Sequence, residues 1–122
     1  MSKPYENKKQ NIKIITGDNM LDIDIHSKNG ILFVRLFGKL NKITRGKMNK
    51  EVVKLLSEIG VNNVVINIQN IKELDEIGKK ELKKCFKITD NCLLCINENQ
   101  TELIKKMKYI TEEKEALKQI KI

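Results

Sequence analysis

The stretch VVINIQNIKELDEIG, residues 64–78, decides the fold, because within it the chain changes from a strand-like to a helix-like pattern. Its first half is rich in β-branched residues, which favour a strand. Its second half holds Asp75 and Glu76 just before a lysine-rich segment whose apolar residues recur at helical spacing. Asp75 is a favoured N-cap residue, and Glu76 then lies in the first helical turn, where the helix dipole stabilises negative charge. A catalytic carboxylate pair and the remnant of a switch are the alternatives to this capping role.

Strands and helices alternate on both sides of this stretch. Residues 20–26 alternate polar and apolar side chains, which is the period of a half-buried strand. Asn29 and Gly30 indicate a tight hairpin turn before a second, nearly continuous apolar strand. The element order predicts one α/β domain with a mixed sheet of about four or five strands and about four helices. The expected strands are 20–26, 31–37, 62–68 and 92–97, and the expected helices are 44–59 and 78–88, with two further helical pieces after residue 101.

Composition and length favour a single soluble domain. The 122 residues are 40% hydrophobic, which suits one core. No apolar run reaches the roughly 18 residues of a membrane helix, so no membrane insertion is expected. The segment MSKPYENKKQ, residues 1–10, lacks the apolar region of a secretory signal, which predicts a cytoplasmic protein. Residues 1–18 are predicted to form a flexible basic arm, with an extra edge strand at 11–16 as an option, and residues 19–122 form the domain.

The three cysteines are predicted to be core residues. Their odd number disfavours a disulfide framework. Cys92 and Cys95 form a CxxC motif, but it lies within NCLLCI, a segment typical of a buried strand. A zinc site would also have to recruit Cys85 and the single histidine, His26. We therefore expect no metal site and no cofactor.

No arrangement of residues predicts an enzyme. His26 is the one histidine, and on an alternating strand it shares a solvated face with Asp22 and Asp24, which disfavours a role as catalytic base. The glycine-rich motifs that cradle phosphates, GxxxxGK[ST] and GxGxxG, do not occur in the sequence.

The chain is basic, with 24 lysine and arginine residues against 16 acidic ones and a net charge of +8. Five lysines follow one side of the predicted helix 78–88. Like charges at this spacing repel one another slightly, so they do not serve helix stability. They form either a solvated face or a surface for an acidic partner. A nucleic-acid surface would need exposed aromatic residues, whereas the three phenylalanines are predicted to be buried. The lysines are Lys79, Lys80, Lys83, Lys84 and Lys87, and the phenylalanines are Phe33, Phe37 and Phe86.

The pattern from about Met20 to Leu117 resembles the STAS domain, the family of bacterial anti-sigma-factor antagonists. The segment ILFVRLFGKLN is similar to the second strand of the family and its G-x-L-D/N turn. The segment VVINIQNIKELDEIG is similar to the family's strand, loop and helix signature, which ends in D-[ST]-x-G. The closing EEKEAL resembles the final helix. The matching positions are Gly38, Leu40, Asn41, Asn67, Asp75 and Gly78.

The resemblance implies a non-enzymatic protein-binding regulator. In such domains the serine or threonine after the motif aspartate is phosphorylated by a partner anti-sigma factor that is a kinase, and the phosphorylated domain releases that partner. Here Glu76 stands at the phosphoacceptor position, and no hydroxyl group occurs in the motif. We therefore predict a degenerate phosphoregulatory site and phosphorylation-independent binding. The site consists of Asp75, Glu76, Ile77 and Gly78.

Residues flanking this site are expected to bind the partner. Asn41 stands where antagonists often carry an acidic residue, so this face is more basic than is usual in the family. Thr44 is the nearest hydroxyl by family geometry and is an alternative phosphosite. The expected partner is an anti-sigma factor with serine kinase activity or another protein with an acidic surface, and a homodimer is compatible with the sequence. A scaffold domain outside sigma regulation and a basic nucleic-acid-binding domain stay open as alternatives. The predicted contact residues are Asn41, Thr44, Lys79, Lys80 and Lys83.

Overall fold

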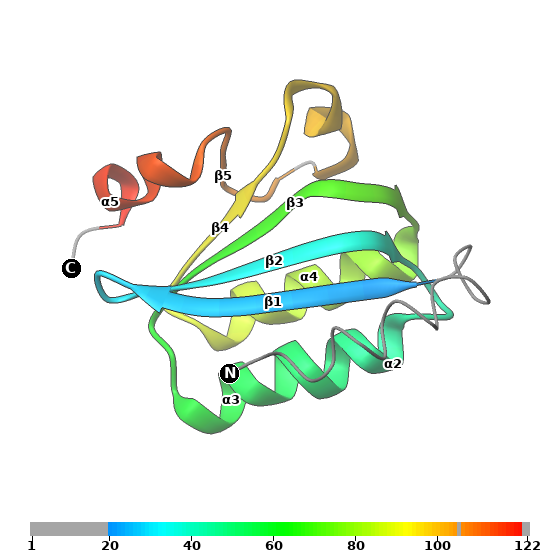
Figure 1. Cartoon of the computed structure of the whole chain (residues 1–122), viewed down its shortest axis with the longest axis horizontal. Coiled ribbons are helices and arrows are strands. Elements are labelled where there is room, and N and C mark those ends of the chain that lie inside the picture. Colours follow the sequence, from blue (N-terminus) through cyan, green and yellow to red (C-terminus); the bar gives the residue numbers. More distant parts are fainter. Residues whose placement is uncertain (1–19, 105, 121–122) are drawn as a thin grey trace.

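The computed structural model describes residues 20–104 and 106–120, which form a five-stranded mixed sheet with helices packed against it (Figure 1). The strand order is β1-β2-β3-β4-β5. β1 and β2 are antiparallel, whereas each later pair of neighbours is parallel. This arrangement confirms the predicted mixed α/β sheet. The strands are β1 (Leu21–Lys28), β2 (Ile31–Leu40), β3 (Asn63–Leu74), β4 (Asn91–Cys95) and β5 (Tyr109–Ile110).

The helices lie in the connections between the parallel strands and after β5. The connection from β2 to β3 is one continuous helix that is α-helical at both ends and a π-helix in the middle. It ends at Gly60, whose left-handed conformation is the usual one for a glycine at a helix C-terminus. The helical segments are α2 (Arg45–Met48), η2 (Asn49–Val53), α3 (Lys54–Ile59), α4 (Glu76–Ile88), the 3₁₀ segments η3 (Glu98–Ile104) and η4 (Glu113–Glu115), and α5 (Ala116–Gln119).

The β1–β2 hairpin forms as the local sequence predicts. Asn29 and Gly30 both have positive φ, 55° and 81°, which is the conformation that a two-residue hairpin turn requires. The turn fixes the register so that His26 pairs with Phe33 and Asp24 pairs with Arg35. The polar residues of β1 therefore lie on the outer face of the hairpin.

Two apolar clusters cover the two faces of the sheet. The larger cluster joins the inner face to the α2–η2–α3 helix and to α4, with Val34, Ile66 and Leu82 fully buried. The smaller cluster lies on the outer face, where Ala116 and Ile120 of the C-terminal segment cover part of β2, β3 and β4. Figure 1 shows α4 along one face of the sheet and α5 at its other side. The outer face of the β1–β2 hairpin is therefore only partly covered.

Several boundaries differ from the sequence prediction. β3 continues to Leu74 instead of ending at 68, because its polar second half pairs with the end of β2. Asn67 therefore lies within β3 and not at the end of a strand. Of the two helical pieces expected after residue 101, the first is the 3₁₀ segment η3, which already begins at Glu98, and the second is formed by η4 and α5. The strand β5 between them and the π-helix were not predicted. Phe37 was expected to be buried, but it is 37% exposed because it faces outward from β2.

The cysteines occupy the core, as predicted. Cys85 on α4 and Cys92 and Cys95 on β4 are all free thiols with buried side chains. Burial is the main cause that raises the pKa of Cys85 to about 12 and that of Cys95 to about 11. The predicted arm at 1–18 and the optional strand at 11–16 lie outside the described residues. Within residues 20–104 and 106–120, no helix combines the length and the apolar character that crossing a membrane requires.

Candidate functional site: the junction of the β2 loop and helix α4

The loop after β2 and the start of α4 meet at one edge of the sheet. β2 and β3 are parallel neighbours, and their last residues, Leu40 and Leu74, are register partners. The backbone N–H of Asp75 donates to the carbonyl of Leu40 over 3.4 Å. The two connections that leave these strands are therefore side by side. The motif residues 75–78 and the loop residues 41–44, which lie far apart in sequence, form one surface.

Asp75 holds the two connections together. It is the N-cap of α4 with an extended backbone, and its Oδ1 accepts a hydrogen bond of 2.7 Å from the N–H of Gly78. Its Oδ2 accepts a second hydrogen bond of 3.0 Å from the N–H of Lys42. The capping interpretation is thus confirmed. Since each carboxylate oxygen binds a backbone donor, the geometry gives Asp75 a structural role rather than that of an acid–base pair with Glu76.

Replacing Asp75 with alanine is expected to lower the free energy of unfolding by about 1–2 kcal/mol, because the N-cap and the link to Lys42 are both lost. Asp75→Asn is the matched control: its amide oxygen can still cap the helix, so its loss should be about half as large or less. Urea unfolding followed by circular dichroism measures both variants. Equal losses for the two variants would contradict the capping role.

Gly78 is required because α4 approaches β2 closely. A Cβ atom built on Gly78 would overlap the carbonyl oxygen of Leu40, and it would also crowd the side chain of Leu74. Backbone atoms cannot move aside as the end of a side chain can. The glycine of the motif therefore sets the distance between the start of α4 and the sheet.

The loop of residues 41–44 is held by its own polar side chains. Asn41 Oδ1 accepts hydrogen bonds from the N–H groups of Ile43 and Thr44, at 2.9 and 3.1 Å. Thr44 Oγ1 accepts from the N–H of Asn41 and donates to the carbonyl of Lys39. Asn41 and Thr44 are only 4% and 7% exposed. They shape the loop from inside, and the residues that it presents to solvent are Lys42 and Ile43.

Two neighbouring side chains project from this junction. Glu76 is 82% exposed, and its Oε2 lies 3.0 Å from Nζ of Lys79, one turn along α4. Ile43 is 61% exposed, the highest value among the exposed large hydrophobic side chains of the described residues, and this was not predicted. The junction therefore presents an exposed isoleucine, the carboxylate of Glu76 and several lysines to solvent.

Fewer lysines of α4 are free of ion pairs than the five that the sequence places on its outer side. Lys79 pairs with Glu76, and Lys84 pairs with Glu81 over 3.0 Å. Among the described residues, no carboxylate pairs with the remaining three. These exposed lysines, Lys80, Lys83 and Lys87, form what we call the α4 lysine face.

Glu81 is a buried carboxylate that sequence analysis missed. It is only 2% exposed, and besides Lys84 it accepts a hydrogen bond of 3.4 Å from Asn49 of the π-helical segment. Glu81 thus ties α4 to η2. The one sequence signal was its spacing of three residues from Lys84.

The remaining candidate residues, His26 and the three cysteines, do not come together as metal ligands in the part of the chain that the structure describes. His26 is half-buried on the outer face of β1, 4.0 Å from the carboxylate of Asp24. No group of three or more histidine, cysteine, aspartate or glutamate side chains in residues 20–104 and 106–120 is placed to hold a metal ion.

The fold is similar to several solved structures of regulatory proteins. An anti-sigma factor antagonist from Mycobacterium paratuberculosis has a TM-score of 0.73 at 13% identity, covering 84% of this chain and 96% of that chain. A protein from Thermotoga maritima described as an anti-sigma factor antagonist has a TM-score of 0.62 at 14% identity, covering 82% and 95%. The anti-sigma factor antagonist SpoIIAA in its unphosphorylated form has a TM-score of 0.61 at 12% identity, covering 80% and 96%. No protein-family model matches the chain. The chain thus has the fold of the anti-sigma factor antagonists, as its resemblance to the STAS domain predicts.

Proposed function

We propose that this protein is a non-enzymatic, protein-binding regulator that binds a kinase-type anti-sigma factor in the cytoplasm and so acts on transcription. The observation that carries the proposal is the junction of the β2 loop with α4. Asp75 and Gly78 have clear structural roles there, while Glu76 and Ile43 are exposed beside the α4 lysine face. These contacts support a binding role for the junction, because its exposed groups are suited to contact another protein.

Phosphorylation-independent binding follows from the residue at position 76. An exposed side chain in the first turn of α4 is where a kinase could reach a hydroxyl, but Glu76 offers none. A carboxylate carries one negative charge, against nearly two on a phosphate at pH 7. Part of that charge is balanced by Lys79 at 3.0 Å. The negative charge at position 76 is thus intermediate between that of an unmodified serine and that of a phosphoserine, and phosphorylation cannot change it.

Thr44 is a poor replacement for the missing phosphosite. Its hydroxyl is buried and donates to the carbonyl of Lys39 over 2.8 Å. A kinase would have to open the loop to reach it. The burial of Thr44 therefore supports binding that phosphorylation does not regulate.

The partner surface is expected to be acidic with an apolar pocket. Lys80 and Lys83 are exposed on α4 without an ion pair among the described residues, and Lys42 and Ile43 are exposed on the adjacent loop. Opposite charges on the partner would accelerate association and favour the correct register. Ile43 would provide the central apolar contact, surrounded by charged residues at the rim.

Isothermal titration calorimetry of the purified protein against each purified kinase-type anti-sigma factor of the source organism tests this proposal. The double variant Lys80→Glu, Lys83→Glu should weaken binding by about tenfold or more, because each change places a carboxylate against an acidic surface. Lys108→Glu with Lys118→Glu is the matched control: it makes the same change in net charge at exposed residues outside α4, so its affinity should stay within about twofold.

Binding to none of these factors would contradict the proposed function. Equal weakening by the two double variants would show that net charge, and not the α4 lysine face, controls the affinity. A non-kinase partner that needs Ile43 and the α4 lysine face would instead indicate a scaffold domain outside sigma regulation.

A further inference from the structure

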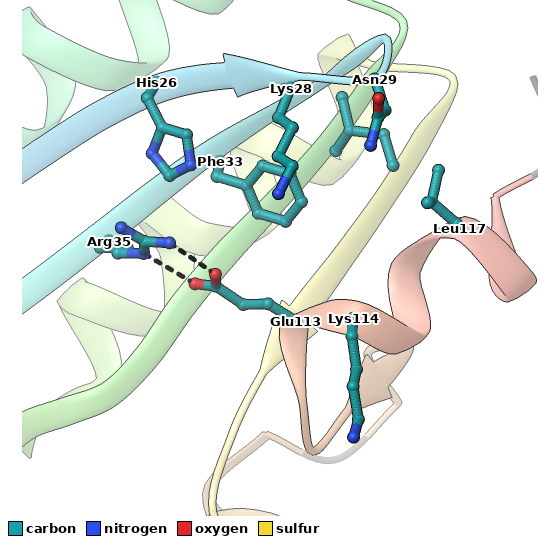
Figure 2. Close-up of a pocket in the computed structure, with 9 residues that line it drawn as sticks. His26, Lys28, Asn29, Phe33, Arg35, Glu113, Lys114 and Leu117 are labelled. Atoms are coloured by element: carbon teal, nitrogen blue, oxygen red, sulfur yellow. Dashed lines mark hydrogen bonds and ion pairs between the residues drawn. The ribbon is translucent and has the colours of Figure 1, made fainter.

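A hollow of about 290 Å³ lies on the sheet face opposite α4, between the β1–β2 hairpin and the C-terminal segment (Figure 2). Its floor is formed by Ile31 and Phe33 of β2, and Leu117 of α5 borders it. It is near the lower end of the roughly 300–1,000 Å³ that small-molecule pockets occupy. None of the residues that line the hollow belongs to the junction of the β2 loop with α4. A ligand site in the hollow therefore does not depend on the proposed function.

One end of the hollow is closed by a network of charged hydrogen bonds. Arg35 donates from Nε to Glu113 Oε2 over 2.9 Å and from Nη2 to Glu113 Oε1 over 2.7 Å. Asn67 donates to the same Oε2 over 2.7 Å. The hydrogen bond from Arg35 is the main cause that holds the pKa of Glu113 below its ordinary value, so the carboxylate stays charged at neutral pH. This network fixes the C-terminal segment against the sheet, and the hollow is consequently a preformed site.

The walls of the hollow suit a flat, apolar group. The rings of His26 and Phe33 are stacked, with centroids 5.3 Å apart and planes inclined by 13°. Leu117 is 51% exposed, although α5 packs Ala116 and Ile120 into the outer-face cluster. An aromatic ring in the hollow would cover part of Leu117 and lie against Phe33.

The charges around the hollow favour an anion. Arg35 is satisfied by Glu113 and lies 3.6 Å from Asp24. Lys114 also lines the hollow, but its ammonium group is paired with Glu112 at 3.2 Å. Lys28 points into the hollow in Figure 2, and it pairs with no carboxylate of the described residues. One ammonium group therefore lies beside an apolar floor without an anionic partner.

We propose that this hollow is a binding site for a small aromatic carboxylate, whose ring packs against Phe33 and Leu117 and whose carboxylate pairs with Lys28. The single available ammonium selects for one negative charge. The carboxylate of Glu113 faces the same hollow and repels an anion placed at its inner end. The ligand carboxylate is therefore oriented toward the hairpin turn, at Lys28 and Asn29.

An NMR titration of the uniformly ¹⁵N-labelled protein with 2-naphthoate tests the proposal, and neutral 2-naphthamide serves as a probe with the same ring system. We expect saturable shifts that are confined to the β1–β2 hairpin and the C-terminal segment. The amide probe should bind about fivefold more weakly or worse, because it makes no ion pair with Lys28. Absence of saturable shifts up to about 10 mM 2-naphthoate would overturn the proposal.

Three exposed positions allow matched variants that should not disturb folding. Lys28→Gln is expected to weaken 2-naphthoate binding by about fivefold while leaving the amide unchanged. Lys118→Gln removes the same charge from an exposed side chain of the C-terminal segment that does not line the hollow, and its affinity should stay within about twofold. Leu117→Ala should weaken both probes, because it removes part of the apolar wall. Equal affinities of wild type and Lys28→Gln for 2-naphthoate would overturn the assignment of Lys28 as the carboxylate partner.

Discussion

Replacing Gly78 with alanine is expected to lower the free energy of unfolding by about 3 kcal/mol. The new Cβ would overlap the carbonyl oxygen of Leu40 and crowd Leu74, so the first turn of α4 would have to move away from the sheet. That movement would lengthen the hydrogen bonds of Asp75, which links the same turn to the loop after β2. Urea unfolding followed by circular dichroism gives the free energy.

Gly46→Ala is the matched control for this prediction. Gly46 lies in α2, and a Cβ atom there would have no neighbouring atom within 4 Å. Since alanine favours a helix over glycine, this variant should be unchanged or more stable by up to about 1 kcal/mol. If Gly78→Ala were as stable as Gly46→Ala, the close contact between α4 and the end of β2 would not exist in solution.

Elements defined by neighbouring residues could be predicted from the sequence. The alternation of 20–26 gave β1 with its correct faces, and Asn29–Gly30 gave the turn. Asp75 was correctly interpreted as the N-cap of α4. In each case the deciding interaction lies within a few residues of the pattern, so the local chain contains the information.

Features that depend on distant partners could not be predicted. Residues 69–74 look like a polar loop, but they form the end of β3 because the last residues of β2 lie beside them. The burial of Asn41 and Thr44 and the exposure of Ile43 depend on how the loop folds over the start of α4. The pairing of Arg35 with Glu113 joins residues 78 positions apart. No periodicity in the sequence reports such contacts.

The second large effect is expected from Glu76→Ser in the presence of the proposed kinase partner and ATP. A serine in the first turn of α4 would restore the hydroxyl that the motif lacks, at a position where the side chain is highly exposed. Phosphorylation would then place up to two negative charges beside Asp75 and Lys79, against an acidic partner surface. The affinity of the phosphorylated variant for its partner should fall by about tenfold or more, because like charges would face each other across the interface.

Glu76→Gln is the control that separates the hydroxyl from the loss of the carboxylate. Glutamine removes the charge but adds no phosphoacceptor, so its affinity should be the same with and without ATP. A fall in affinity for Glu76→Gln after ATP treatment would mean that a different residue is modified.

The central claim is that Glu76 abolishes the phosphorylation switch while the binding surface is retained. The most direct measurement is the dissociation constant of the native protein for its kinase-type anti-sigma factor, before and after incubation with ATP, with the intact mass recorded in parallel. The claim predicts no added phosphate and an affinity that changes by less than about twofold, whereas Glu76→Ser gains a phosphate and loses its partner. A native protein that gains a phosphate and releases its partner would contradict the claim.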